Sequence, residues 1–345
     1  MRPISAADSV SLAIHRTRDL LFRPFRWGTY LKLGLVAILT EGLGGNSGSS
    51  SHAGPSSGHG PMVYSPFDIP PQWIVAIIAA VLVIILLSIA IFYLITRLRF
   101  AFFDCLIHNT SEIGPGWRLY RAQATRFFWM NLGVAFCYLL LMALAALPFI
   151  AGFVRVFREI PPGGQPDVMQ LLPLILPLIP IILLLVLVGV VIDVILRDCM
   201  MPHYALDDAT AGEAWREAWA RITAEPRQFL VYALLRLILP VIAMIGLFIV
   251  LLIPGLMLAG AGAAIGYAIH SAFADATGAA ALVGILIQVF FGLVAFGLAL
   301  LASICLGGPV STAVREYALV FYGGRYQALG EILYPPPPPP AQPAV

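Results

Sequence analysis

Residues 168–192 read VMQLLPLILPLIPIILLLVLVGVVI, 25 consecutive residues without a charged side chain. An α-helix needs about 20 apolar residues to cross the roughly 30 Å of hydrocarbon in a bilayer. Four further uncharged runs that are long enough to cross lie at 73–95, 127–154, 237–274 and 276–314. The sequence therefore predicts an all-α, polytopic membrane bundle.

The composition supports this fold class and narrows the function. The chain is 60% hydrophobic and 11% charged, against about 25% charged in an ordinary soluble domain. A net charge of +2 without a dense basic cluster argues against nucleic-acid binding. No Walker A, H-E-x-x-H, G-x-S-x-G or dinucleotide-binding pattern occurs. We therefore predict a protein that is not an enzyme and that has no cofactor and no metal.

Basic residues fix the predicted orientation, because Lys and Arg concentrate in cytoplasmic loops. A sixth crossing is expected at 27–43, a run interrupted by Lys32 and Glu41. With six crossings, 17 basic residues fall on one side and two on the other. This predicts a bacterial inner-membrane protein with both termini cytoplasmic. The run at 254–274 admits three interpretations: a re-entrant turn, an external extension of the fifth helix, or an extra span.

The chain divides into one membrane domain and a tail. Residues 1–330 form the predicted domain, which begins with an amphipathic cytoplasmic stretch at 1–26. Residues 46–60 (NSGSSSHAGPSSGHG) are expected to be a flexible external loop. Residues 331–345 contain six consecutive prolines and are predicted to be a disordered cytoplasmic tail. The four cysteines form no C-x-x-C, so we expect no disulfide.

Two cytoplasmic segments resemble each other and indicate an internal repeat. Asp104 and His108 in the first correspond to Asp198 and His203 in the second. Four such ligands converging across a pseudo-twofold axis would suit a divalent metal. Capping and hydrogen bonding at helix ends is the commoner role for these residue types, and it is the one we favour.

The second repeat contains a predicted amphipathic helix. Thr210 and Glu213 have the spacing of a capping box, and Glu225-Pro226 should end the helix. Apolar residues with helical spacing form one face, namely Ala214, Trp215, Ala218, Trp219 and Ile222. The pattern predicts either a helix in the cytoplasmic membrane interface or a packing helix beneath the bundle.

Polar groups inside apolar runs are the remaining site candidates. Asp193 and Arg236 lie at similar depths on the fourth and fifth spans, so an intramembrane pair is plausible. Gly307-Gly308-Pro309 looks like a helix break. Free N–H groups around Gly308, with Ser311 and Thr312, could bind an anion, although a simple kink is the commoner outcome.

Three stretches carry a resemblance to a known family. They are Leu21-Phe22-Arg23-Pro24-Phe25, the block from Glu213-Ala214-Trp215-Arg216 to Leu230, and the closing segment from Pro309 to Tyr326. The chain resembles uncharacterised bacterial polytopic proteins, distantly similar to the membrane domain fused to some glycerophosphodiester phosphodiesterases. The resemblance implies the fold, and it transfers no activity because the phosphodiesterase barrel is missing.

The function favoured by the sequence is a non-enzymatic membrane component that organises lipid or protein partners at the cytoplasmic face. A small-solute or lipid transporter is the alternative, supported by the repeat and the Asp193–Arg236 pair. An intramembrane metal-dependent lipid hydrolase using the four repeat residues is the weakest interpretation. The expected partners are the bilayer, and either a phospholipid or a protein at the cytoplasmic face.

Overall fold

A computed structural model describes residues 4–42, 71–159, 168–273 and 279–335. Within these residues every regular element is helical, which confirms the predicted all-α architecture. Five helices are long: α3 (Pro71–Ile107), α5 (Arg121–Glu159), α6 (Val168–Val194), α9 (Pro226–Ala272) and α10 (Ala279–Gly323). Each contains a stretch that is long and apolar enough to cross a membrane.

The remaining elements are short. Six are α-helices: α1 (Asp8–Phe22), α2 (Trp27–Ala37), α4 (Ile113–Leu119), α7 (Met201–Leu206), α8 (Ala211–Ala224) and α11 (Gln327–Leu333). Two are π-helical segments, η1 (Ile38–Gly42) and η2 (Ile195–Met200), which continue α2 and α6 respectively. Short π-helical segments are rare and are frequent at functional sites.

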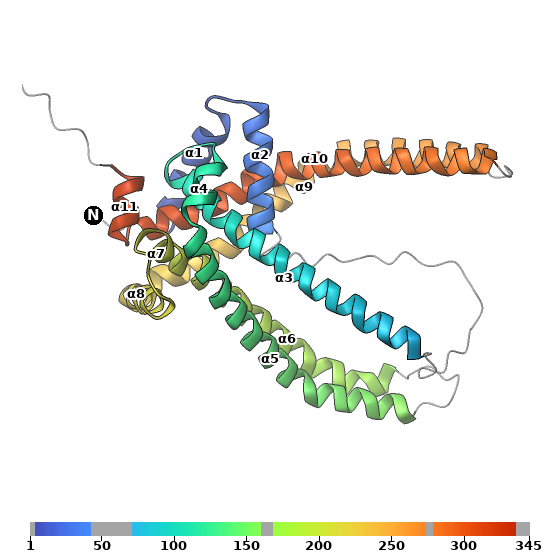
Figure 1. Ribbon diagram of the computed structural model, residues 1–345, viewed down its shortest axis with the longest axis horizontal. Coiled ribbons are helices and arrows are strands. Elements are labelled where there is room, and N and C mark those ends of the chain that lie inside the picture. The colour runs from blue at the N-terminus through green and yellow to red at the C-terminus, as the bar shows by residue number, and fades with distance from the viewer. Residues whose placement is uncertain (1–3, 43–70, 160–167, 274–278, 336–345) are drawn as a thin grey trace, which may run out of the picture.

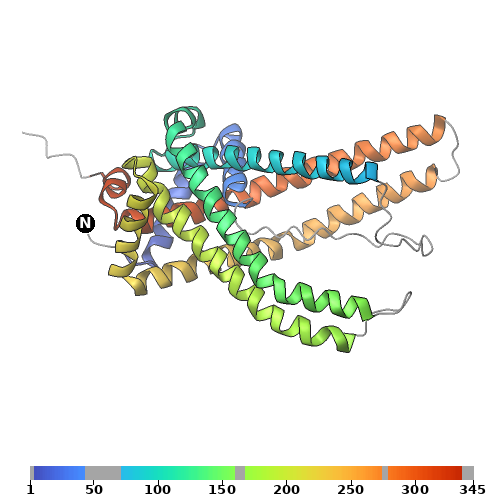
Figure 2. The ribbon, with the colours of Figure 1, turned by 60° about the horizontal axis from the view of Figure 1, so that its bottom comes forward.

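The elements form a head and three arms (Figures 1 and 2). The head contains the six short helices, both π-helical segments and the adjoining ends of the long helices. The arms are the remaining parts of α3, of the α5/α6 pair and of the α9/α10 pair, and they diverge from the head. The core lies in the head, where Phe100, Phe127, Tyr204 and Tyr317 are at most 2% exposed.

The arms bury almost nothing within the protein. In each of the five candidate spans the most apolar 18-residue stretch has no buried residue. A helix that is apolar on all sides needs an apolar environment on all sides. The arms therefore have the surface of helices that are covered by lipid.

The head is held together by close helix crossings at small residues. α1 packs against α10, and its buried residues include the small side chains of Ser9, Ala13 and Thr17. α2 crosses α10 where Gly34 meets Gly308, and a Cβ atom added to Gly308 would lie 2.6 Å from the Gly34 Cα. Only glycine permits backbones to approach this closely.

α10 has no break at Gly307-Gly308-Pro309, so the less favoured of the two interpretations, a break with an anion site, is wrong. α10 continues through Gly307, Gly308 and Pro309, and the buried Thr312 hydroxyl donates to the Gly308 carbonyl at 2.8 Å. Ser311 is half-buried on the same continuous helix. Since this stretch is not a helix N-terminus, the N–H groups proposed for an anion are used within the helix, and Gly308 is a packing contact.

Two other predictions change in detail. α9 is unbroken through Pro240 and Pro254, so the apolar run that follows Pro254 extends the fifth helix, as one of three interpretations proposed. α11 places Leu333 in the core, so the folded domain extends beyond residue 330, and residues 336–345 lie outside the described residues. The predicted loop at 46–60 also lies outside them.

The predicted first crossing, at 27–43, is not among the five candidate spans of the described residues. α2 and η1 are together too short to be among the helices able to span, and α2 runs across the long helices (Figure 1). Its buried residues, including Leu33 and Ala37, pack in the head. Arg325 Nη1 donates to the Ile4 carbonyl, so the first described residue lies against the turn between α10 and α11. The connection from Gly42 to Pro71 falls on residues 43–70, which the structure does not describe.

Candidate functional site: a buried ionic cluster at the base of the arms

Seven charged side chains meet where the arms join the head, and we call them the ionic cluster. They come from six elements: Glu41, Arg99, Asp193, Arg197, Asp198, Arg236 and Arg315. Both π-helical segments contribute, because η1 carries Glu41 and η2 carries Arg197 and Asp198.

Asp198 is the most heavily bonded carboxylate of the cluster. Arg315 Nη1 donates to its Oδ1 at 2.7 Å, and Arg236 Nε donates to its Oδ2 at 3.1 Å. The buried Tyr232 hydroxyl also donates to Oδ2, at 2.6 Å. Asp198 is 2% exposed, and these three donors compensate the cost of burying its charge.

Glu41 connects the N-terminal segment to the long helices. Its Oε2 accepts from Arg236 Nη2 at 2.9 Å, and its Oε1 lies 3.6 Å from Arg197 Nη2. The neighbouring Thr40 carbonyl accepts hydrogen bonds from both Arg99 and Arg197. The cluster therefore fastens η1 to α3, η2 and α9.

The predicted Asp193–Arg236 pair is wrong, because each residue has other partners. Asp193 Oδ2 accepts from Arg197 Nη1 at 2.8 Å, one helical turn away on the same helix. Arg236 instead bridges Glu41 and Asp198. The sequence correctly placed both residues near this depth but assigned the wrong neighbours.

The four repeat residues do not converge on one point. Asp104 Oδ1 lies 3.2 Å from His108 Nδ1 in a local contact, whereas Asp198 belongs to the ionic cluster. His203 is 1% exposed and lies between Asp207, at 3.1 Å from Nδ1, and the Tyr322 hydroxyl, at 2.8 Å from Nε2. In the described part of the chain no three His, Cys, Asp or Glu side chains are placed to hold a metal.

The amphipathic helix α8 forms as predicted. The Thr210 backbone N–H donates to Glu213 Oε2 at 2.9 Å, which confirms the capping box. This bond, with a second from the Thr210 hydroxyl, lowers the pKa of the Glu213 carboxyl. Helix α8 ends at Ala224, immediately before Glu225-Pro226.

The apolar face of α8 is divided between the head and its surroundings. Ala214 and Ala218 are fully buried against the head. Trp215 and Trp219 stack on each other, with ring centroids 5.7 Å apart, and remain about half exposed. A second exposed aromatic group, Phe22, Phe25 and Trp27, adjoins Tyr30 at the start of α2. Trp side chains with this exposure are typical of membrane–water interfaces.

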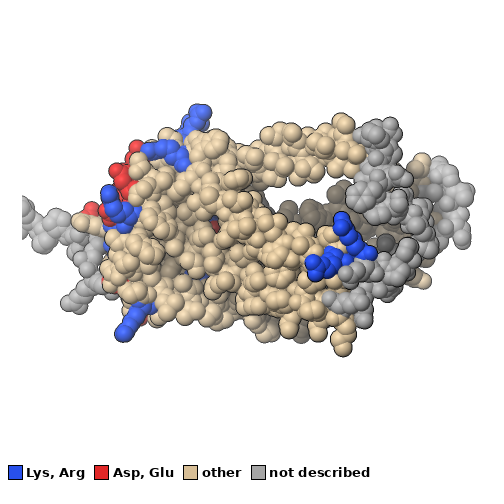
Figure 3. Space-filling view, turned by 90° about the horizontal axis from the view of Figure 1, so that it is seen from below, with Lys and Arg blue, Asp and Glu red and all other residues tan. Residues whose placement is uncertain are grey.

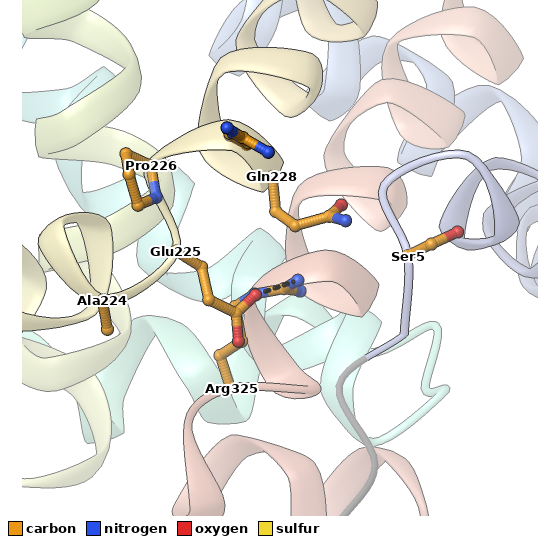
Figure 4. Close-up of a pocket in the computed structure, with 7 residues that line it drawn as sticks. Ser5, Ala224, Glu225, Pro226, Gln228 and Arg325 are labelled. Carbon is orange, nitrogen blue, oxygen red and sulfur yellow. Dashed lines mark hydrogen bonds and ion pairs between the residues drawn. The ribbon is translucent and has the colours of Figure 1, made fainter.

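Charge on the surface is concentrated at the ends of the molecule. In Figure 3 acidic and basic side chains gather over the head end, a second basic group lies at the far end of an arm, and the surface between them is uncharged and encloses an open gap. A hollow at the head end is lined by Ser5, Ala224, Glu225, Pro226, Arg227, Gln228 and Arg325 (Figure 4). Arg325 Nη2 donates to Glu225 Oε2 at 2.8 Å there, so this arginine is already neutralised.

Comparisons with known proteins give a family and no activity. Searches of curated proteins and of solved structures find no match. A family model does match residues 4–332, which is nearly the whole described fold, and its description is "Family of unknown function (DUF7544)". The chain therefore belongs to family DUF7544, a family of unknown function.

Proposed function

We propose that this protein is a non-enzymatic integral membrane component that organises phospholipid at the membrane face where its head lies. The observation that carries the proposal is the combination of arms that are apolar on all sides with a head that exposes Trp and Arg. The arrangement matches hydrocarbon around the arms and lipid headgroups around the head. With the distribution of basic residues, it favours a bacterial inner membrane with the head in the cytoplasmic leaflet.

The exposed aromatic residues support an interfacial position for the head. Trp215 and Trp219 face away from the core on α8, and Trp27 does so on α2. On the opposite face of α8, Arg221 Nη1 donates to Glu217 Oε2 at 3.0 Å. An amphipathic helix with this division lies in the plane of the interface and binds by its apolar area and by attraction to anionic lipid.

The structure gives less support to a transporter of polar solutes. In the described helical parts of the α9/α10 arm, over 237–272 and 279–304, the polar side chains are Tyr267, His270, Ser271, Gln288 and Ser303. Apart from Arg99, which donates to the Thr40 carbonyl, the charged groups at the base are engaged with one another. Neither described hollow includes Asp193 or Arg236. A lipid transporter is the competing function, because the arms leave an open gap (Figure 3) and expose apolar side chains.

Proteoliposomes distinguish the two functions. Pyrene-labelled phosphatidylglycerol reports lipid clustering through excimer fluorescence, and dithionite reduction of a nitrobenzoxadiazole-labelled lipid reports transbilayer movement. We expect excimer fluorescence above that of protein-free vesicles and no acceleration of transbilayer movement. The Trp215→Ala, Trp219→Ala variant should lose the excess, while Trp73→Ala, which alters an exposed Trp at the far end of α3, should retain it. Fast transbilayer movement with unchanged excimer fluorescence would favour the transporter.

A further inference from the structure

Arg99 is the member of the ionic cluster that lacks a carboxylate partner. Its side chain is fixed, because Nε donates to the Thr40 carbonyl at 3.2 Å and the residue is 7% exposed. Its two terminal nitrogens make no hydrogen bond to any described residue. Unlike Arg197 Nε, which is enclosed without a partner, they are not sealed from the surface. Arg99 therefore presents a fixed guanidinium edge with unused donors.

The charge balance of the cluster points to a missing anion. Four arginines face three carboxylates, which leaves an excess of one positive charge. Each carboxylate is already engaged: Asp193 by Arg197, Glu41 by Arg197 and Arg236, and Asp198 by Arg236 and Arg315. An uncompensated buried charge is costly, so an anion that reaches Arg99 would stabilise the head.

The position of Arg99 along α3 identifies the kind of anion available. Arg99 follows Trp73, which is exposed near the other end of the same helix, by 26 residues. At 1.5 Å per residue the separation is about 39 Å. This exceeds the ~30 Å of hydrocarbon and is slightly less than the 40–45 Å that include the headgroups. With Trp73 at one interface, Arg99 lies in the phosphate layer of the other.

We infer that Arg99 binds the phosphate of one phospholipid whose acyl chains lie against α3. Its terminal nitrogens have the fork geometry with which arginine binds phosphate through two parallel hydrogen bonds. The half-exposed Asp193 carboxylate is part of the same cluster and would oppose a second anion, so a single lipid is expected. The inference rests on the proposed function and names the ligand of the head.

Native mass spectrometry of the full, delipidated chain in detergent tests this site. Phosphatidylglycerol is titrated into the wild type and into Arg99→Gln, whose amide can still donate to Thr40. We expect one saturable adduct, weakened at least tenfold in Arg99→Gln and less in Arg99→Lys, which keeps the charge without the fork. Arg118→Gln, which removes an exposed arginine from α4, is the charge-matched control and should bind like the wild type.

Two further probes define the ligand. Phosphatidylethanolamine should also bind less tightly to Arg99→Gln, because it carries the same phosphate. Inorganic phosphate should bind far more weakly than either lipid, and equal binding would overturn the assignment to a lipid. Equal affinity of wild type and Arg99→Gln for phosphatidylglycerol would overturn the site itself. If Arg99→Gln does not fold, Arg99→Lys decides by the same comparison. Loss of this site would leave the Trp215 and Trp219 dependence of lipid clustering intact, so the two proposals fail separately.

Discussion

Asp198→Asn, which replaces one carboxylate oxygen by an NH₂ group, is expected to be the most destabilising substitution of this size in the head. Asp198 accepts from Arg315, Arg236 and Tyr232, at 2.7, 3.1 and 2.6 Å. Asparagine retains one acceptor oxygen but turns an NH₂ group toward a donor, and the excess charge of the cluster rises from one to two. Breaking a buried ion pair by removing one partner costs about 3–5 kcal/mol, a large part of the 5–15 kcal/mol that typically stabilises a domain.

The assay is reversible unfolding in mixed micelles of a mild detergent and dodecyl sulfate, followed by circular dichroism. Asp193→Asn is the matched control, because Asp193 has one arginine partner and its side chain is 38% exposed. Exposed ion pairs contribute about 0.2–1 kcal/mol to stability. The free energy of unfolding of Asp193→Asn should therefore fall by at most that amount. An Asp198→Asn variant no less stable than Asp193→Asn would refute the argument that the cluster holds the head together. Asp198 and Arg315 should also be coupled in a double-mutant cycle, whereas Asp193 and Arg236 should be nearly additive.

Three other changes test separate parts of the structure. Gly308→Ala should lower the free energy of unfolding by about 1–3 kcal/mol through overpacking against Gly34. Gly28→Ala is the control, because a Cβ atom there meets no atom within 4 Å, and it should not have this cost. Equal effects of the two changes in the unfolding assay would contradict the α2–α10 crossing. Glu213 has a lowered pKa in the folded protein, so its stabilising effect is present above its ordinary value of 4.5 and is lost as pH falls through the folded value. The difference in melting temperature between wild type and Glu213→Gln should therefore disappear in acid, and a difference that grows there would exclude the capping box as its source. Deletion of residues 335–345 should leave the melting temperature unchanged, since Leu333 is the last residue that α11 places in the core; a clear decrease would show that the tail contributes to folding.

The long helices could be predicted from sequence because the bilayer imposes a minimum apolar length on any helix that crosses it. The start of α8 could also be predicted, since the capping box is a local pattern of two residues, and Thr210 and Glu213 form it. Such features depend on neighbours in the sequence or on the solvent. They do not require knowledge of which helices meet.

The ionic cluster could not be predicted in the same way. Glu41 and Arg236 are 195 positions apart, and depth along a helix does not reveal the direction in which a side chain points. Depth alone suggests an ion pair between Asp193 and Arg236. In the structure Asp193 instead pairs with Arg197, which lies one turn away on the same helix. The π-helical segments that bring Glu41, Arg197 and Asp198 together leave no recognisable local pattern.

Gly307-Gly308-Pro309 allows a break or a kink from the sequence alone, and the structure excludes the break. In soluble helices this combination ends or kinks the helix. In membrane helices neighbouring groups and local adjustments satisfy the freed backbone, so proline is tolerated. Here Gly308 is explained by its contact with Gly34 of α2, a tertiary feature that the sequence of α10 alone does not contain.

The lipid composition around the protein in its own membrane shows most directly whether it organises phospholipid. Polymer-excised native discs containing wild-type protein would be compared by lipid mass spectrometry with discs made from the same membrane without it. We expect phosphatidylglycerol to be enriched around the wild type, reduced in Arg99→Gln, and reduced further when Trp215 and Trp219 are also replaced by alanine. A composition equal to that of the bulk membrane in all three proteins would contradict a role in organising phospholipid.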